Sequence, residues 1–109
     1  MNVNIKDLIL SEDKIRLTQD QKNLIELAFI KQIPPEDAEF IEKVKKEARS
    51  SKDKMDTFTE LSAYYTAKYG SEFGMVYLSA VMGGEEKYNE TVASIEKMRA
   101  EERVKSQSN

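Results

Sequence analysis

Helix-breaking residues are scarce in this sequence, and they stand close together. The 109 residues include two prolines and four glycines, which occur as Pro34-Pro35, Gly70, Gly74 and Gly83-Gly84. The segments between them are rich in Glu, Lys, Leu, Ile and Ala, residues that favour helices. We therefore expect an all-α protein, a compact bundle of four to five helices. The length predicts a single domain, residues 1–105, with a frayed tail over residues 106–109.

The first segment, residues 3–17, allows two interpretations. Mostly apolar triplets flank the polar run from Ser11 to Lys14, as in a short β-hairpin with a four-residue turn. The same pattern also fits an irregular segment or a short helix. We favour the irregular or short helical form, because an isolated hairpin is marginally stable without a sheet to join.

The first clear helix signal begins at Thr18. Thr18 and Gln21 have the spacing of a capping box, and apolar residues continue as far as Ile33. Pro34-Pro35 should end this helix, because the residue before a proline avoids the helical conformation. A second helix should start at or just after Pro35. Proline suits the first helical position, and the acidic residues that follow suit the helix dipole.

A third helix is expected from about Asp53 to Tyr69, with Gly70 as its left-handed stop. The spacing Gly70-x-x-x-Gly74 would also permit two helices to approach closely, but that motif matters mostly in membranes. We therefore interpret these two glycines as a helix stop followed by a tight start.

Two more helices are expected beyond this point. Ser71 should cap a short helix over residues 72–82 that ends at Gly83-Gly84, and the last helix should begin near Glu85. The longest mostly apolar run, residues 73–82, would rise about 15 Å as a helix, half of what a bilayer requires. We therefore expect no membrane-spanning segment.

Cysteine, histidine and tryptophan are absent from the sequence. Without cysteine there is no disulfide, no thiolate nucleophile and no sulfur ligand for a metal. Without histidine there is no Ser-His-Asp or Cys-His arrangement and no zinc site of the usual types. We expect a protein that is not an enzyme and uses no metal or cofactor. The lack of cysteine and of a signal-peptide pattern favours a soluble, cytoplasmic protein.

Charge is distributed unevenly along the chain. Of the 17 basic and 20 acidic side chains, only four lie within residues 55–84, a stretch rich in tyrosine and methionine instead. Such residues are typical both of a helical core and of a protein contact surface. Tyr64 and Tyr65 are adjacent and would point about 100° apart on a helix, so one core cannot easily bury both.

We therefore expect part of this charge-poor stretch to be an interface, while its interpretation as core stays open. The partner would be another protein or a second copy of the chain, giving a homo-oligomer. The residues predicted to supply the contact are Tyr64, Tyr65, Tyr69, Phe73, Met75, Tyr77, Leu78 and Met82.

The leading functional hypothesis is a non-catalytic protein–protein interaction module, such as an adaptor, an inhibitor or an assembly chaperone. The alternative is a nucleic-acid-binding accessory protein that uses the Lys43–Lys54 face. Residues 35–54 carry six basic and six acidic side chains, whereas a nucleic-acid surface normally has a positive excess. The small size, the Lys/Glu-rich composition and the lack of an enzyme signature resemble small phage-encoded accessory proteins, although no motif carries that resemblance.

The acidic clusters Glu36-Asp37-x-Glu39 and Glu85-Glu86-x-x-x-Glu90 raise a third hypothesis, an enzyme that works with carboxylates and an oxygen-ligated divalent metal. Both clusters fall in the first turn of an expected helix, where the dipole favours acidic residues. We therefore interpret them as helix starts and not as metal ligands.

Overall fold

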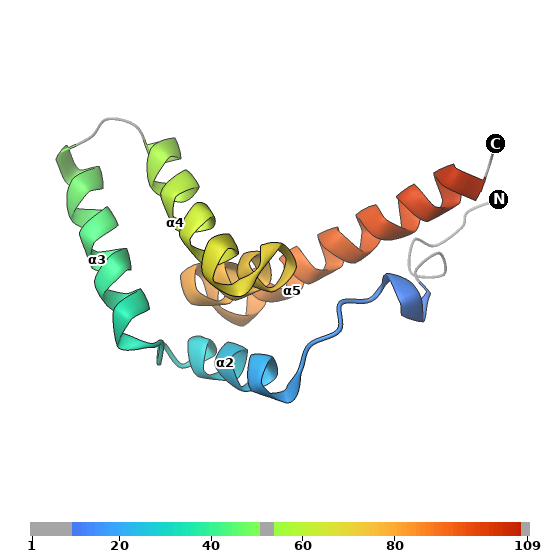
Figure 1. Ribbon diagram of the computed structural model, residues 1–109, viewed down its shortest axis with the longest axis horizontal. Helices are drawn as coiled ribbons and strands as arrows, with labels where there is room; N and C mark the ends of the chain where they lie inside the picture. The colour runs from blue at the N-terminus through green and yellow to red at the C-terminus, as the bar shows by residue number, and fades with distance from the viewer. Residues whose placement is uncertain (1–9, 51–53, 108–109) are drawn as a thin grey trace.

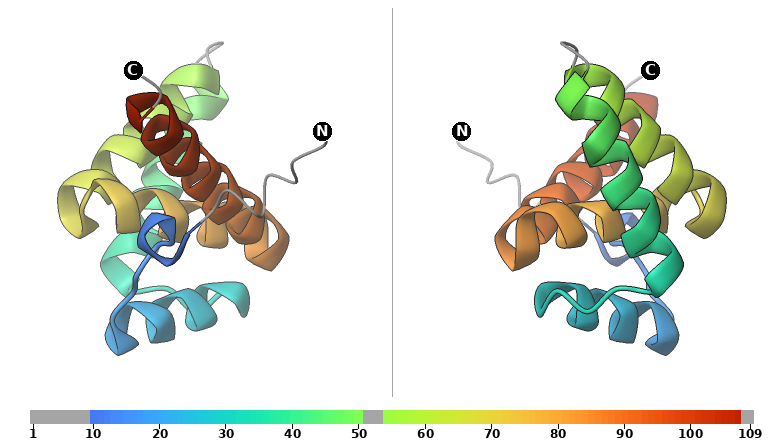
Figure 2. Two further views of the ribbon diagram at one scale, coloured as in Figure 1. Left: turned by 90° about the vertical axis from the view of Figure 1, so that its right-hand side faces the viewer. Right: turned by 90° about the vertical axis from the view of Figure 1, so that its left-hand side faces the viewer.

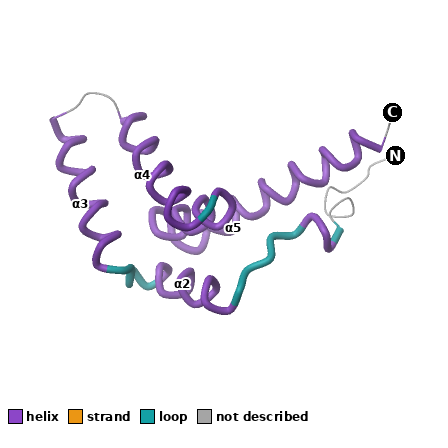
Figure 3. Tube along the Cα trace, in the orientation of Figure 1, coloured by secondary structure: helices purple, strands orange, loops and turns teal. Residues whose placement is uncertain are grey.

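The computed structural model describes residues 10–50 and 54–107. They form a short 3₁₀ turn, η1 (Ser11–Asp13), and four α-helices, which are α2 (Gln19–Phe29), α3 (Pro35–Ser50), α4 (Lys54–Tyr69) and α5 (Ser71–Gln107). Figures 1 and 3 show this order, with no strand among the described residues. The expected all-α fold is therefore confirmed.

The structure confirms two of the predicted helix starts. Thr18 caps α2 with both bonds of a capping box, since its Oγ1 accepts from the Gln21 N–H and the Gln21 side chain accepts from the Thr18 N–H. Pro35 is the first residue of α3, and the Pro34 carbonyl accepts the N–H groups of Asp37 and Ala38. Local sequence thus defines where these helices begin.

The end of α2 differs from the prediction. The helix stops at Phe29 and not at Ile33, because Lys31 adopts the left-handed conformation with φ 61°. The Lys31 N–H then bonds to the Ala28 carbonyl and the Gln32 N–H bonds to the Leu27 carbonyl, which is the Schellman pattern. That position usually holds glycine, so the sequence gives little sign of this stop.

Both expected glycine breaks appear in the structure. Gly70 has φ 97° and separates α4 from α5. Gly84 has φ 72° and ψ −161°, a non-helical conformation that kinks α5. We call residues 71–83 the first arm of α5 and residues 85–107 its second arm. The two predicted C-terminal helices correspond to these arms, and none of the described helices is long and apolar enough to cross a membrane.

The expected compact shape is wrong. The radius of gyration is 16.3 Å, against about 13 Å for a compact chain of this length, and the extents are 51 × 34 × 23 Å. Figure 1 shows why, because α3 stands at one edge and the second arm reaches out at the other. Among the described helices, α3 packs closely only on α4, and both views in Figure 2 place α2 below the other helices.

The first arm of α5 is the centre of the core. It packs against α4, and α2 covers α5 from another side. Five residues of the arm belong to the core, whereas its other side is open, with Met75 half-buried and Ser71 and Met82 exposed. The buried apolar cluster comprises Ile25, Ala28, Ile41, Val44, Leu61, Tyr65, Phe73, Val76, Tyr77, Leu78 and Ala80.

The N-terminal segment is attached to the second arm of α5. Asp13, in η1, is buried and forms an ion pair with Arg103, and the Ile15 N–H donates to the Glu96 carboxylate at 3.0 Å. Residues 10–17 contain the 3₁₀ turn and an irregular stretch, in agreement with the favoured interpretation. The other half of the alternative hairpin, residues 3–9, lies outside the described residues. At the C-terminal end, α5 extends to Gln107, and residues 108–109 of the expected tail are not among the described residues.

Gly74 provides the closest packing between α4 and α5. A Cβ atom at this position would lie 2.5 Å from the Tyr65 carbonyl oxygen and 2.9 Å from the Thr66 Cα. The Gly70-x-x-x-Gly74 spacing therefore has two roles, because Gly70 stops one helix and Gly74 lets the next helix approach it. Only the first of these roles was expected from the sequence.

We predict that Gly74→Ala destabilises the protein by at least about 2 kcal/mol, because overpacking against backbone outweighs the gain of about 1 kcal/mol in helix propensity. Gly70→Ala is the matched control. It meets no atom within 4 Å and suffers only left-handed strain, for which about 1 kcal/mol is expected. Denaturant unfolding measures both. A Gly74→Ala protein as stable as the wild type would contradict the close approach.

We predict that Lys31→Gly stabilises the protein by about 0.5–1 kcal/mol, because glycine adopts the left-handed conformation without strain. The greater freedom of glycine in the unfolded chain offsets part of this gain. Lys22→Gly, in the exposed face of the same helix, should instead destabilise by about 1 kcal/mol. Thermal unfolding followed by circular dichroism would separate the two, and equal losses in both variants would argue against the Schellman end.

Candidate functional site

Four of the eight predicted contact residues lie in the core. Tyr65 and Tyr77 are fully buried, and Leu78 and Phe73 are nearly so. The Tyr65 and Tyr77 rings meet edge to face, with centroids 5.4 Å apart, and both hydroxyl groups are buried with no hydrogen-bond partner among the described residues. Burial raises the pKa of Tyr77 to about 12. For these four residues the core interpretation holds, because they pack against other helices of the same chain.

Tyr64 and Tyr65 point towards different helices, as their adjacent positions predict. Tyr65 points into the core between α4 and α5, whereas Tyr64 points towards α3 and stacks on Phe40 with ring centroids 4.1 Å apart. Because α3 supplies a second wall beside α4, the chain itself covers part of the Tyr64 ring. Tyr64 is half-buried, and so is Tyr69.

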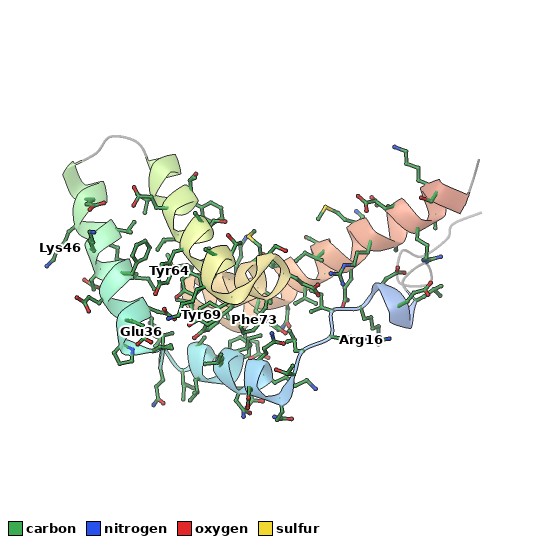
Figure 4. All side chains as sticks on the ribbon, viewed as in Figure 1. Arg16, Glu36, Lys46, Tyr64, Tyr69 and Phe73 are labelled. Carbon is green, nitrogen blue, oxygen red and sulfur yellow. The ribbon has the colours of Figure 1, made fainter. Side chains whose placement is uncertain are left out.

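Asp37 is the centre of a polar cluster between α3 and α4. Its side chain has no exposed surface, and its carboxylate accepts a hydrogen bond from the Tyr64 hydroxyl at 2.6 Å. The Tyr69 hydroxyl donates to the other oxygen, and Lys68 Nζ lies 2.7 Å from the first. Figure 4 shows Tyr64 and Tyr69 side by side at the inner end of α4. We call Asp37, Tyr64, Lys68 and Tyr69 the Asp37 cluster.

The donors around Asp37 keep it ionised. Burial alone would raise the pKa of Asp37, but the hydrogen bonds from Lys68, Tyr64 and Tyr69 outweigh it and lower the pKa below its usual value. The hydrogen bond to Asp37 likewise raises the pKa of Lys68. Asp37 also lies in the first turn of α3, where the helix dipole favours a negative charge.

This arrangement fixes α3 to α4 and leaves both carboxylate oxygens engaged. Glu36 and Glu39, the other two acidic residues at the start of α3, are exposed. The three carboxylates of Glu36-Asp37-x-Glu39 therefore do not converge on one point. In the described part of the chain, no group of three His, Cys, Asp or Glu side chains is placed to hold a metal ion. From the sequence, Asp37 was expected only to suit the dipole at the start of α3. Tyr64 and Lys68 are four residues apart on α4, but no local signal pairs them with Asp37.

A groove lies between the two arms of α5. It has a volume of about 600 Å³, and its apolar lining comes from Met75 on the first arm and from Ile95 and Met98 on the second. We call it the α5 groove. The charged and polar side chains that complete its lining are Ser71, Glu72, Lys87, Glu90, Thr91, Ser94 and Arg99.

Two contacts between the arms hold the α5 groove in shape. Arg99 forms an ion pair with Glu72 at 2.5 Å, and the hydroxyls of Ser79 and Thr91 are 2.7 Å apart. Thr91 and Ser94 are small, which leaves space beside the half-buried Ile95. Met98 is 56% exposed, a large fraction for an apolar side chain. The groove is thus an apolar hollow with a charged margin.

The two predicted methionines lie at the surface of different hollows. Met75 is half-buried and lines the α5 groove. Met82 is 50% exposed and lines a smaller hollow of about 330 Å³, to which α2, α3 and α5 all contribute. The structure therefore does not gather the eight predicted residues into one surface. Ile95 and Met98 were not predicted as contact residues, although Tyr88, Val92, Ile95 and Met98 recur at helical spacing and form one apolar stripe on the last helix.

The predicted basic face is mixed in charge. Lys43, Lys45 and Lys46 are exposed on α3, and so are Glu42 and Glu47, which precede and follow them in the sequence. The remaining members of that face, Arg49, Lys52 and Lys54, have side chains outside the described part of the chain. Over residues 35–47, three basic side chains stand against five acidic ones, so this part of α3 has no excess of positive charge.

Comparison of the chain with protein-family models, with curated proteins and with solved structures finds no match. The function must therefore be argued from the geometry of the Asp37 cluster and the α5 groove.

We predict that Asp37→Asn destabilises the protein by about 2–3 kcal/mol at neutral pH, because it removes charge-assisted hydrogen bonds from a buried position. The folded pKa of Asp37 lies below the usual 3.8, so its stabilisation is fully present above that value. It is lost as the pH falls through the folded pKa. The difference in unfolding free energy between the wild type and Asp37→Asn should therefore shrink below about pH 4.

Glu36→Gln is the matched control, since Glu36 is the exposed neighbour and lies 3.6 Å from Lys68 Nζ. It should change stability by no more than about 0.5 kcal/mol at any pH, as for an exposed ion pair. Denaturant unfolding from pH 3 to pH 7 measures both variants. Similar behaviour of the two variants would show that Asp37 is not the residue that joins α3 to α4.

Proposed function

We propose that this protein is a non-catalytic protein–protein interaction module, an adaptor, inhibitor or assembly chaperone that works by holding or covering a partner. The observation that carries the proposal is the α5 groove, an apolar hollow of about 600 Å³ with charged side chains at its margin. An apolar centre with a polar rim is the usual anatomy of a protein interface.

The residues of the α5 groove support a binding role. Methionine is flexible and polarizable, so Met75 and Met98 can adapt their shape to an apolar partner surface. A groove with apolar side chains along one helix suits the apolar face of another helix. Exposing 56% of Met98 to water is unfavourable in the isolated chain, and a docked partner would cover it.

The groove is also preformed, which supports tight binding. Its walls are helical, the Glu72–Arg99 ion pair ties the arms together, and the ion pair between Asp13 and Arg103 ties the second arm to η1. A partner would therefore not have to order the groove, and less free energy would be lost on association.

The contact surface in this proposal differs from the one expected from sequence. The tyrosines of the charge-poor stretch face other helices of the chain, so Met75 is the member of the predicted set that the proposal keeps. The contact moves along α5 to Ile95 and Met98.

We predict that a photo-cross-linking amino acid at Ser94 forms protein adducts in cells that produce the protein, because Ser94 lines the groove. The same group at Lys46, exposed on α3, is the control and should form few. Adding Met98→Glu should remove the Ser94 adducts by placing a charge in the apolar contact. It should change stability by less than about 0.5 kcal/mol, as expected for an exposed side chain.

Adducts from Ser94 that Met98→Glu removes support the proposal, whether the captured protein is a second copy or another chain. Equal adducts at Ser94 and Lys46, or adducts that persist with Met98→Glu, would overturn it. A nucleic-acid probe shift at low salt that is lost in Lys43→Glu, without Ser94 adducts, would favour the alternative function.

A further inference from the structure

We infer that the α5 groove binds a second copy of this chain, with the second arms of α5 antiparallel across a two-fold axis. The inference rests on the proposed function and specifies its partner. The observation that carries it is the order of charged residues along the second arm. When two second arms lie antiparallel in one particular register, each basic groove residue faces an acidic residue of the other copy.

One face of the second arm lines the groove. Lys87, Thr91, Ser94 and Met98 all contribute to its lining, and they are four, three and four residues apart. This spacing keeps side chains on one face of a helix, as in a coiled-coil seam. Glu102 is four residues further on and lines a small hollow next to Met98, so the face continues over about 22 Å.

An antiparallel two-fold contact pairs this face with itself when the axis passes between Ser94 and Ile95. Lys87 of each copy then lies opposite Glu102 of the other, because the two positions are equally far from the axis. By the same count, Glu90 lies opposite Arg99. In a two-fold contact each pair occurs twice, so four pairs of opposite charge flank the apolar centre.

The apolar positions match in the same register. Thr91 lies opposite Met98, so the exposed methionine of one copy faces the small residues of the other. Thr91 and Ser94 leave the space beside Ile95 that a methionine can enter. A large side chain facing a small one is the arrangement that lets helices interdigitate.

Other arrangements of the two arms lose this match. In a parallel pair, Lys87 would face Lys87 and Arg99 would face Arg99, and like charges in contact are unfavourable. Moving the axis by two residues in either direction, which shifts the register by about one turn, leaves Lys87 opposite Ser106 or Met98. Only the antiparallel register centred between Ser94 and Ile95 pairs both basic groove residues with acidic ones.

The test is a charge exchange measured by sedimentation equilibrium of the full chain. We predict that the wild type forms a dimer, and that Lys87→Glu or Glu102→Lys alone weakens it at least about tenfold, since each creates two like-charge contacts. The double variant Lys87→Glu with Glu102→Lys should recover the wild-type dissociation constant to within about threefold.

Lys46→Glu is the control for a change of net charge, because Lys46 is exposed on α3 away from the groove, and it should leave the dissociation constant unchanged. Circular dichroism should show the same helicity in all variants. The inference is overturned if the single variants leave the dimer dissociation constant unchanged, or if the double variant does not restore the wild-type value.

Different outcomes would overturn the proposed function and this inference. A chain that stays monomeric to about 100 µM, while Ser94 adducts to a different protein form in cells, overturns self-association and leaves the interaction module standing. A monomer without any Ser94 adduct overturns both.

Discussion

The close packing of α4 on the first arm of α5 is the contact on which the rest of the structure depends. Gly74 lets the backbone at Tyr65 approach without a side chain between the helices. This brings the Tyr65, Tyr69 and Tyr77 rings together, with centroids 5.0–5.7 Å apart. With Tyr65 turned inward, Tyr64 faces outward on α4, where Phe40 and Asp37 fix α3. Because α3 packs closely only on α4, its position also depends on this contact.

Helix boundaries were predictable where one residue determines the backbone. The Thr18 capping box, Pro35 and the glycines at 70 and 84 act through local hydrogen bonds or positive φ, so their effect can be inferred from sequence. Lys31 adopts the same left-handed conformation, but lysine seldom does, and the end of α2 was therefore placed four residues too late. The compact shape was also wrong, because sequence periodicity gives the apolar face of α3 but not how many helices cover it.

The sites were less predictable, because they join residues far apart in the chain. Seven of the eleven residues of the buried cluster lie in the charge-poor stretch. It could not distinguish core from interface, because that depends on whether α3 or a partner covers Tyr64. Asp37 lies 27 and 32 residues before Tyr64 and Tyr69, and no local pattern links them. The α5 groove needs two arms in a particular geometry, which composition does not contain.

That geometry comes from Gly84. Glu72 and Arg99 are separated by 27 residues, so a straight helix would place them about 40 Å apart, yet their side chains form an ion pair. The non-helical conformation of Gly84 folds the second arm back towards the first and opens a hollow between them. From the sequence, Gly84 was expected only to end one helix. In the folded chain it makes two ordinary amphipathic arms into the walls of a groove, so the binding surface depends on one backbone conformation as much as on the residues that line it.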